Sequence, residues 1–97
     1  MSGMTPIGEI RAAIRNSPAD GVERAIILTI PRDEWTVALE TAIAQLRESE
    51  RVIVEMRKDH QAGWDDTRAN AAVRMAREAR TRIGEETERL IPRYCVY

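Results

Sequence analysis

The sequence predicts a mainly α-helical fold, built on one long antiparallel helical hairpin with a short helix before it. Two stretches, about 32–60 and 66–91, carry apolar or small residues at alternating spacings of three and four, the pattern of a helix with one buried stripe. The short segment 61–64 contains a glycine and separates them. Long helices joined by a tight turn pack antiparallel, so we expect a hairpin within a single domain over residues 1–97.

The N-terminal segment carries the signal of a short helix. Thr5 is a suitable cap, and Pro6 follows at the first helical position, where a missing N–H costs nothing. The apolar stripe that follows consists of Ile7, Ile10, Ala13 and Ile14. This helix is short and needs another element to pack against.

Residues 24–30 are compatible with either a short strand or a helix. Ile26, Ile27 and Ile30 make the segment β-branched and apolar on both sides, which suits a buried strand. The preceding Ser17 to Asp20 segment instead resembles a capped helix start. A strand would need a second copy to pair its edge.

The first long helix is expected to begin directly after Pro31. Proline fixes φ and ends the preceding element, while Asp33 and Glu34 complement the dipole of a first turn. Its stripe consists of Trp35, Leu39, Ala42, Leu46, Ser49, Ile53, Met56 and His60. Ser49 is polar, and we interpret it as a residue that sets the register of the packing.

The second long helix is expected to start at Asp65 or Asp66 and to end before Pro92. Its stripe consists of Ala69, Ala72, Ala76, Ala79, Ile83, Glu86 and Leu90. Alanines let the two backbones approach closely but bury little apolar area. Ion pairs spaced four apart are expected on the exposed face, at Arg74–Glu78, Glu78–Arg82 and Glu85–Arg89.

The composition predicts self-association. The chain has no Phe, its aromatic content is 4%, and a 97-residue domain of this kind buries a thin core. Apolar residues outside the two stripes are more numerous than one partner helix can cover: Val37, Ile43, Val52, Val54, Val73, Met75 and Ile91. We expect a homo-oligomer whose interface draws on Trp35, Leu39, Leu46, Ile53, Met56, Ile83, Leu90, Tyr94 and Tyr97.

Charge and cysteine content exclude several kinds of partner. A net charge of -1 argues against non-specific nucleic-acid binding, which needs a basic surface. Cys95 and His60 are the only Cys and His, so one chain has neither an internal disulfide nor a zinc site. No apolar run reaches the roughly 18–20 residues of a membrane span. Residues 1–4 lack the basic and apolar regions of a signal peptide, so none is expected. We expect a cytoplasmic protein without a cofactor or a membrane partner.

The arginines near the N-terminus are the candidate ligand-binding residues. Arg11, Arg15, Arg24 and Arg32 have fewer acidic neighbours than the arginines of the second long helix. Because guanidinium groups suit phosphate and carboxylate, a small anionic ligand is expected to bind there if one binds at all.

Two segments resemble phage proteins that sequester cyclic-nucleotide signals and are themselves helical hairpins. They are residues 39–46, Leu-Glu-Thr-Ala-Ile-Ala-Gln-Leu, and residues 69–73, Ala-Asn-Ala-Ala-Val. In that family a Leu-Glu-Glu-Ala segment runs directly into Trp-Ala-Asn-Ala-Ala-Ile, whereas here the segments are far apart and the second lacks the Trp. The resemblance implies a ligand sponge and transfers no binding residue.

These patterns predict a non-catalytic, self-associating helical protein that acts by binding. A phage or mobile-element accessory protein that inhibits a host component, in the host cytoplasm, fits this description. The alternatives are a sponge that holds a small anion such as a nucleotide between protomers, and a structural assembly subunit. No pattern of nucleophile, base and acid points to an enzyme.

Overall fold

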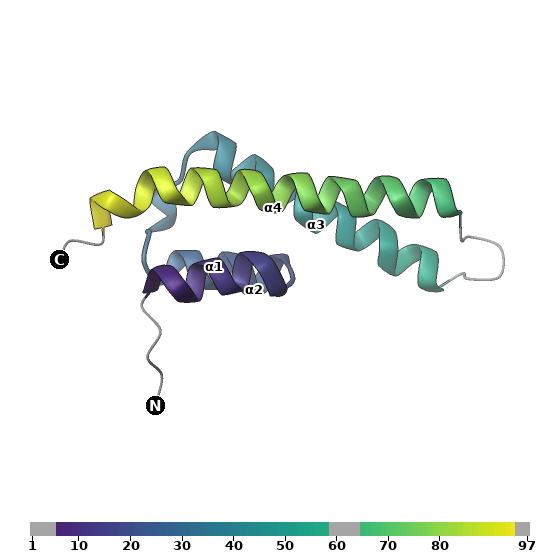
Figure 1. Ribbon diagram of the computed structural model, residues 1–97, viewed down its shortest axis with the longest axis horizontal. Coiled ribbons are helices and arrows are strands. Elements are labelled where there is room, and N and C mark those ends of the chain that lie inside the picture. The colour runs from purple at the N-terminus through teal and green to yellow at the C-terminus, as the bar shows by residue number, and fades with distance from the viewer. Residues whose placement is uncertain (1–5, 59–64, 95–97) are drawn as a thin grey trace, which may run out of the picture.

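The computed structural model describes residues 6–58 and 65–94, which are helical apart from short connections (Figure 1). The elements in order are α1 (Pro6–Asn16), α2 (Ala19–Ile27), a 3₁₀ turn η1 (Arg32–Glu34), α3 (Val37–Lys58) and α4 (Asp66–Tyr94). The two long helices, α3 and α4, pack against each other, which confirms the predicted hairpin. The predicted turn at 61–64, together with Thr5, His60, Cys95 and Tyr97, lies outside the described residues.

The short helices α1 and α2 cover only one half of this hairpin. Helix α1 contacts α2 and α4, and α2 contacts α3. Figure 1 shows both short helices beneath the half that holds the C-terminal end of α4, while the other half projects beyond them. We call residues 49–58 and 66–76 the distal half of the hairpin, and the remainder of α3 and α4 the proximal half. The radius of gyration, 15.1 Å, exceeds the roughly 12.5 Å of a compact chain of this length.

The hydrophobic core lies where all four helices meet, in the proximal half. Its large, fully buried side chains are Ile10, Val22, Ile26, Ile30, Leu39, Leu46 and Ile83. Each contributes about 1.5–3 kcal/mol by leaving water. In the distal half the buried positions hold smaller or flexible side chains: Ser49, Met56, Ala69 and Ala72. The large apolar side chains of the fold are therefore concentrated at one end.

The ambiguous segment 24–30 forms the end of α2 and the turn after it. Val22, Ile26 and Ile30 are each 0% exposed, whereas Arg24 and Leu28 between them are exposed. In a strand, residues two apart share a face, so this pattern belongs to a helical segment. The strand alternative is wrong. Glu50 of α3 accepts a hydrogen bond from the Ala19 backbone N–H at 2.8 Å, so a carboxylate from another helix satisfies the first turn of α2.

The first long helix starts later than the sequence predicts. Residues 32–34 form the 3₁₀ turn, and Trp35 is extended, with φ -71° and ψ 140°. The indole of Trp35 is buried and donates a hydrogen bond to the Ile30 carbonyl oxygen at 2.9 Å, which holds the chain in a bend. The Thr36 hydroxyl then accepts a hydrogen bond from the Leu39 N–H at 3.1 Å and caps α3.

Helix α4 also differs from the prediction at its C-terminal end. It continues through Pro92 to Tyr94, so the proline lies in the last turn of the helix and does not end it. The polar position of its buried stripe is Thr87, 1% exposed, and not Glu86. The Thr87 hydroxyl donates to the Ile83 carbonyl oxygen at 2.9 Å, which satisfies it inside the core.

The ion pairs predicted along the exposed face of α4 do not form as expected. Arg89 pairs with Glu86 at 3.3 Å instead of with Glu85. Among the described residues, neither Arg74 nor Glu78 takes part in an ion pair, because exposed side chains gain little from one fixed geometry. In the part of the chain that is described, no helix is both long and apolar enough to cross a membrane.

Candidate functional site

An apolar groove of about 410 Å³ runs between α3 and α4 in the distal half. It is lined by Pro18, Ser49, Glu50, Ile53, Val54, Arg57, Ala72, Val73 and Ala76. We call it the distal groove. It is open because Ala72 and Ala76 present only methyl groups to α3, and because α1 and α2, whose connection at Pro18 borders the groove, do not extend over it.

The walls of the distal groove expose apolar side chains to water. Val54 of α3 and Val73 of α4 are each 48% exposed. Ser49 at the groove is 2% exposed, and its hydroxyl donates to the Leu46 carbonyl oxygen at 2.7 Å. An apolar hollow with satisfied polar groups and exposed valines is typical of an interaction surface.

The rim of the distal groove carries one acid and one base on α3. Glu50, Ile53, Val54 and Arg57 follow one another at intervals of three, one and three residues, so they share one face of the helix. Glu50 is held in place by its hydrogen bond from the Ala19 N–H. Arg57 is exposed and forms no ion pair with any residue the structure describes. The face therefore has an apolar centre with opposite charges at its two ends.

Most of the residues predicted at an interface lie inside the single chain. Trp35, Leu39, Leu46, Met56, Ile83 and Leu90 are all buried. Ile53 is partly buried and lines the distal groove. Tyr97 and the side chain of Tyr94 lie outside what the structure describes. Among the surplus apolar residues, Ile43 and Ile91 are buried, whereas Val37, Val54, Val73 and Met75 are exposed.

A second hollow, of about 350 Å³, lies between α1 and α4. It is lined by Arg11, Ile14, Arg15, Arg77, Arg80, Thr81, Gly84 and Glu88. We call it the arginine pocket. It brings together two of the predicted ligand-binding residues, Arg11 and Arg15, and adds two arginines of α4 that the sequence analysis did not single out. Arg77, Arg80, Thr81, Gly84 and Glu88 follow one another at intervals of three, one, three and four residues, so they share one face of a helix and this face could have been found from the sequence.

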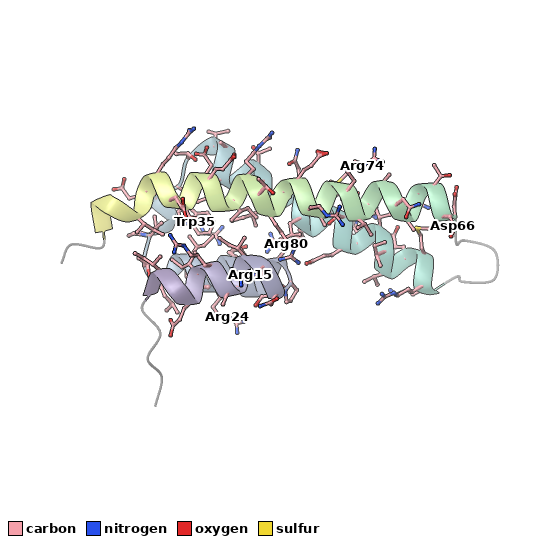
Figure 2. The ribbon with its side chains drawn as sticks, in the orientation of Figure 1. Arg15, Arg24, Trp35, Asp66, Arg74 and Arg80 are labelled. Carbon is pink, nitrogen blue, oxygen red and sulfur yellow. The ribbon has the colours of Figure 1, made fainter. Side chains whose placement is uncertain are left out.

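Arg80 is the best-anchored side chain of the arginine pocket. Its terminal nitrogen Nη1 donates to the Ile14 carbonyl oxygen at 2.6 Å and to the Ser17 carbonyl oxygen at 2.8 Å. These acceptors lie at the C-terminal end of α1, where carbonyls lack helical partners. Figure 2 shows Arg80 in the space between α4 and α1, with Arg15 on α1. Arg80 therefore both joins the two helices and fixes one wall of the pocket.

The other two predicted ligand-binding arginines do not line this pocket. Arg24 lies on α2 and is exposed, and Figure 2 shows it on the side away from α4. Arg32 in the 3₁₀ turn pairs with Glu23, and its guanidinium lies 5.1 Å from the centre of the Trp35 ring. A cation over an indole face is a stabilising contact, so Arg32 helps to hold the bend before α3.

Glu23 is the centre of an ion-pair network between α2 and α3. Arg47 of α3 contacts Glu23 at 2.6 Å and Asp20 at 2.8 Å. The hydrogen bond from Arg47 lowers the pKa of the Glu23 carboxyl below its usual 4.5, against a smaller opposing effect of burial, and Arg32 lowers it further. The same contacts raise the pKa of Arg47. This network positions the short helices against the hairpin.

The described residues contain no group of three or more Asp, Glu, His or Cys side chains that could hold a metal ion. Comparison of the chain with protein-family models, curated proteins and solved structures finds no match.

Proposed function

We propose that this protein acts by binding rather than by catalysis, and that its copies self-associate through the distal groove. The observation that carries the proposal is the face of α3 formed by Glu50, Ile53, Val54 and Arg57, which borders an open apolar hollow. A helix laid into such a hollow buries the exposed valines, in the manner of helix-in-groove recognition.

The arrangement of charges on this face favours a second copy of the chain as the occupant. A two-fold axis between residues 53 and 54 would align two α3 helices antiparallel. Glu50 of each copy would then lie opposite Arg57 of the other, because the two positions are equidistant from that centre. A two-fold interface uses the same patch on both subunits and therefore must be self-complementary. The apolar centre, Ile53 and Val54, would pack against its own counterpart.

The distal half has apolar surface to supply such an interface, because Val54 and Val73 are each 48% exposed beside the groove. Pairing of distal halves would also resemble a four-helix bundle, the usual way in which helical hairpins complete their cores.

The test places a charge in the centre of the distal groove. Val54→Glu should convert a dimer into a monomer at micromolar concentration, measured by light scattering after size exclusion. The fold should persist because Val54 is half exposed, and surface substitutions cost within about 0.5 kcal/mol. Val37→Glu is the matched control, since Val37 is 80% exposed on α3 but does not line the groove. It should leave the dimer intact.

A charge exchange tests the geometry of the pairing. Arg57→Glu and Glu50→Arg should each weaken the homodimer, because like charges would face each other across the axis. An equimolar mixture of the two variants should form a heterodimer, in which every acid faces a base. Circular dichroism checks that Glu50→Arg keeps its fold despite losing the contact with the Ala19 N–H. A mixture that stays monomeric would contradict the antiparallel pairing.

The same measurements separate the other binding roles expected from the sequence. A wild-type monomer would reject self-association and leave a helix of another protein, such as an inhibited host component, as the occupant of the groove. Large wild-type assemblies that persist in Val54→Glu would instead favour a structural subunit that assembles through another surface.

A further inference from the structure

We infer that the arginine pocket is a binding site for a compact, phosphate-bearing small molecule. This inference is independent of the proposed self-association, because the residues that line the arginine pocket and those that line the distal groove do not overlap. Either proposal can therefore fail without the other.

The charge of the lining is strongly positive. Four guanidinium groups and a single carboxylate, Glu88, surround the pocket. Glu88 accepts a hydrogen bond from Arg11 at 3.0 Å, but both side chains are about 60% exposed, so this pair is weak and can be exchanged for a ligand. Within the described residues, Arg15 and Arg77 form no ion pair, although the overall charge of the chain is -1. The pocket thus gathers positive charge that the chain itself does not neutralise.

Arg80 makes the arginine pocket more favourable for binding an anion. The last carbonyls of α1 point into this region and carry negative partial charge, which would repel a phosphate. By donating to the Ile14 and Ser17 carbonyl oxygens, Arg80 neutralises that charge and is itself held in place. A guanidinium that is already ordered loses less entropy when its remaining N–H groups bind a ligand.

Gly84 provides a separate observation that points to an occupant. Glycine inside a helix weakens it relative to alanine, so a close contact usually explains its presence. Here a Cβ atom added at Gly84 would meet no atom within 4 Å. No packing contact of the chain therefore requires glycine at this position. What the missing side chain does provide is open space in the wall of the arginine pocket.

The dimensions and chemistry of the pocket define the class of ligand. Its volume, about 350 Å³, is at the lower end of the range for small-molecule sites. Arginine forks bind phosphate oxygens in pairs. The Thr81 hydroxyl at the pocket donates to the Arg77 carbonyl oxygen at 3.1 Å and can still accept a hydrogen bond from a hydroxyl group of the ligand. Ile14 offers an apolar contact for the part of the molecule that bears the phosphate. A pyrophosphate or a mononucleotide matches this combination.

The experiment measures binding of pyrophosphate and of adenosine monophosphate to the full chain by calorimetry, at constant ionic strength. We expect saturable binding by at least one of these probes. Arg15→Gln and Arg77→Gln should each weaken it about tenfold or more, as expected for loss of a charge-assisted hydrogen bond. Arg24→Gln is the matched control, an exposed arginine that does not line the pocket, and it should bind like the wild type.

Gly84 supplies variants that alter the space and not the charge. Gly84→Leu should abolish binding by filling the pocket. Gly84→Ala, which adds only one methyl group, should fold more stably and weaken binding less than Gly84→Leu. Adenosine tested beside its monophosphate shows whether the phosphate or the nucleoside is recognised. Four results would overturn the inference. They are absence of binding by both phosphate probes, binding of adenosine as strong as that of its monophosphate, equal weakening by Arg24→Gln, and undiminished binding by Gly84→Leu.

Discussion

The two halves of the hairpin are built from the same pair of helices but from different side chains. In the proximal half, Leu39, Leu46 and Ile83 are fully buried beneath α1 and α2. In the distal half the positions of α4 that face α3 are alanines, and valines remain exposed beside the groove. Burial of large side chains supplies most of the stability of a small domain. The proximal half therefore holds the chain together, and the distal half leaves apolar surface for a partner.

The largest effect should come from deleting a buried side chain of the proximal half. Leu46→Ala leaves a cavity where Leu46 is 0% exposed, and we expect a loss of about 2–5 kcal/mol in the free energy of unfolding, measured with urea. Val54→Ala in the distal half, studied in the monomeric state at low concentration, should cost no more than about 0.5 kcal/mol. Similar losses for both variants would remove the contrast between the halves.

An intermediate effect is expected at the bend that leads into the proximal half. Trp35→Phe keeps an aromatic ring but removes the indole N–H, so the buried Ile30 carbonyl loses its donor. Leaving such a group unsatisfied costs about 1–3 kcal/mol, which urea unfolding would detect. Trp35→Phe should also shift the amide NMR signals of Thr36 and Leu39 at the cap of α3, while those of Val54 stay unchanged. A shift confined to the distal half would contradict this role for Trp35.

Much of the fold follows from local patterns, and the departures have tertiary causes. The stripe of small and apolar residues correctly predicts the hairpin, because side-chain periodicity depends only on helix geometry. The sequence predicts a start of α3 directly after Pro31, but the helix begins at Val37, because the hydrogen bond from Trp35 to Ile30 holds the chain in a bend that helix propensity does not predict. Segment 24–30 was ambiguous because isoleucine is compatible with both a buried strand and a buried helix.

The candidate sites were harder to predict because they depend on which helices become neighbours. Arg11 and Arg15 were identified from their local lack of acids, but the contribution of Arg80 depends on α4 packing against α1. Arg32 was selected on the same grounds, yet the fold places it beside Glu23. The surplus valines were recognised from sequence, whereas their position beside a groove depends on where α1 and α2 end.

The smallest effect is expected from the ion-pair network around Glu23, which attaches α2 to the proximal half. It should appear as a dependence of stability on pH. Because Arg47 and Arg32 lower the pKa of Glu23 below 4.5, the ionised carboxylate stabilises the fold fully above that value. This contribution is lost as the pH falls through the lowered pKa, since the carboxyl then takes up a proton in the folded state as well. Glu23→Gln should therefore destabilise the protein at pH 6, by a few tenths to about 1 kcal/mol.

At pH 3 the difference between Glu23→Gln and the wild type should shrink, as measured by urea unfolding at both pH values. Arg47→Met removes the main partner of Glu23. When it is introduced into both the wild type and Glu23→Gln, the difference in unfolding free energy between the two should already be smaller at pH 6. If the difference were instead the same at pH 6 and pH 3, Glu23 would act through its shape and not through its charge. The attachment of α2 would then depend on the burial of Val22 and Ile26 alone.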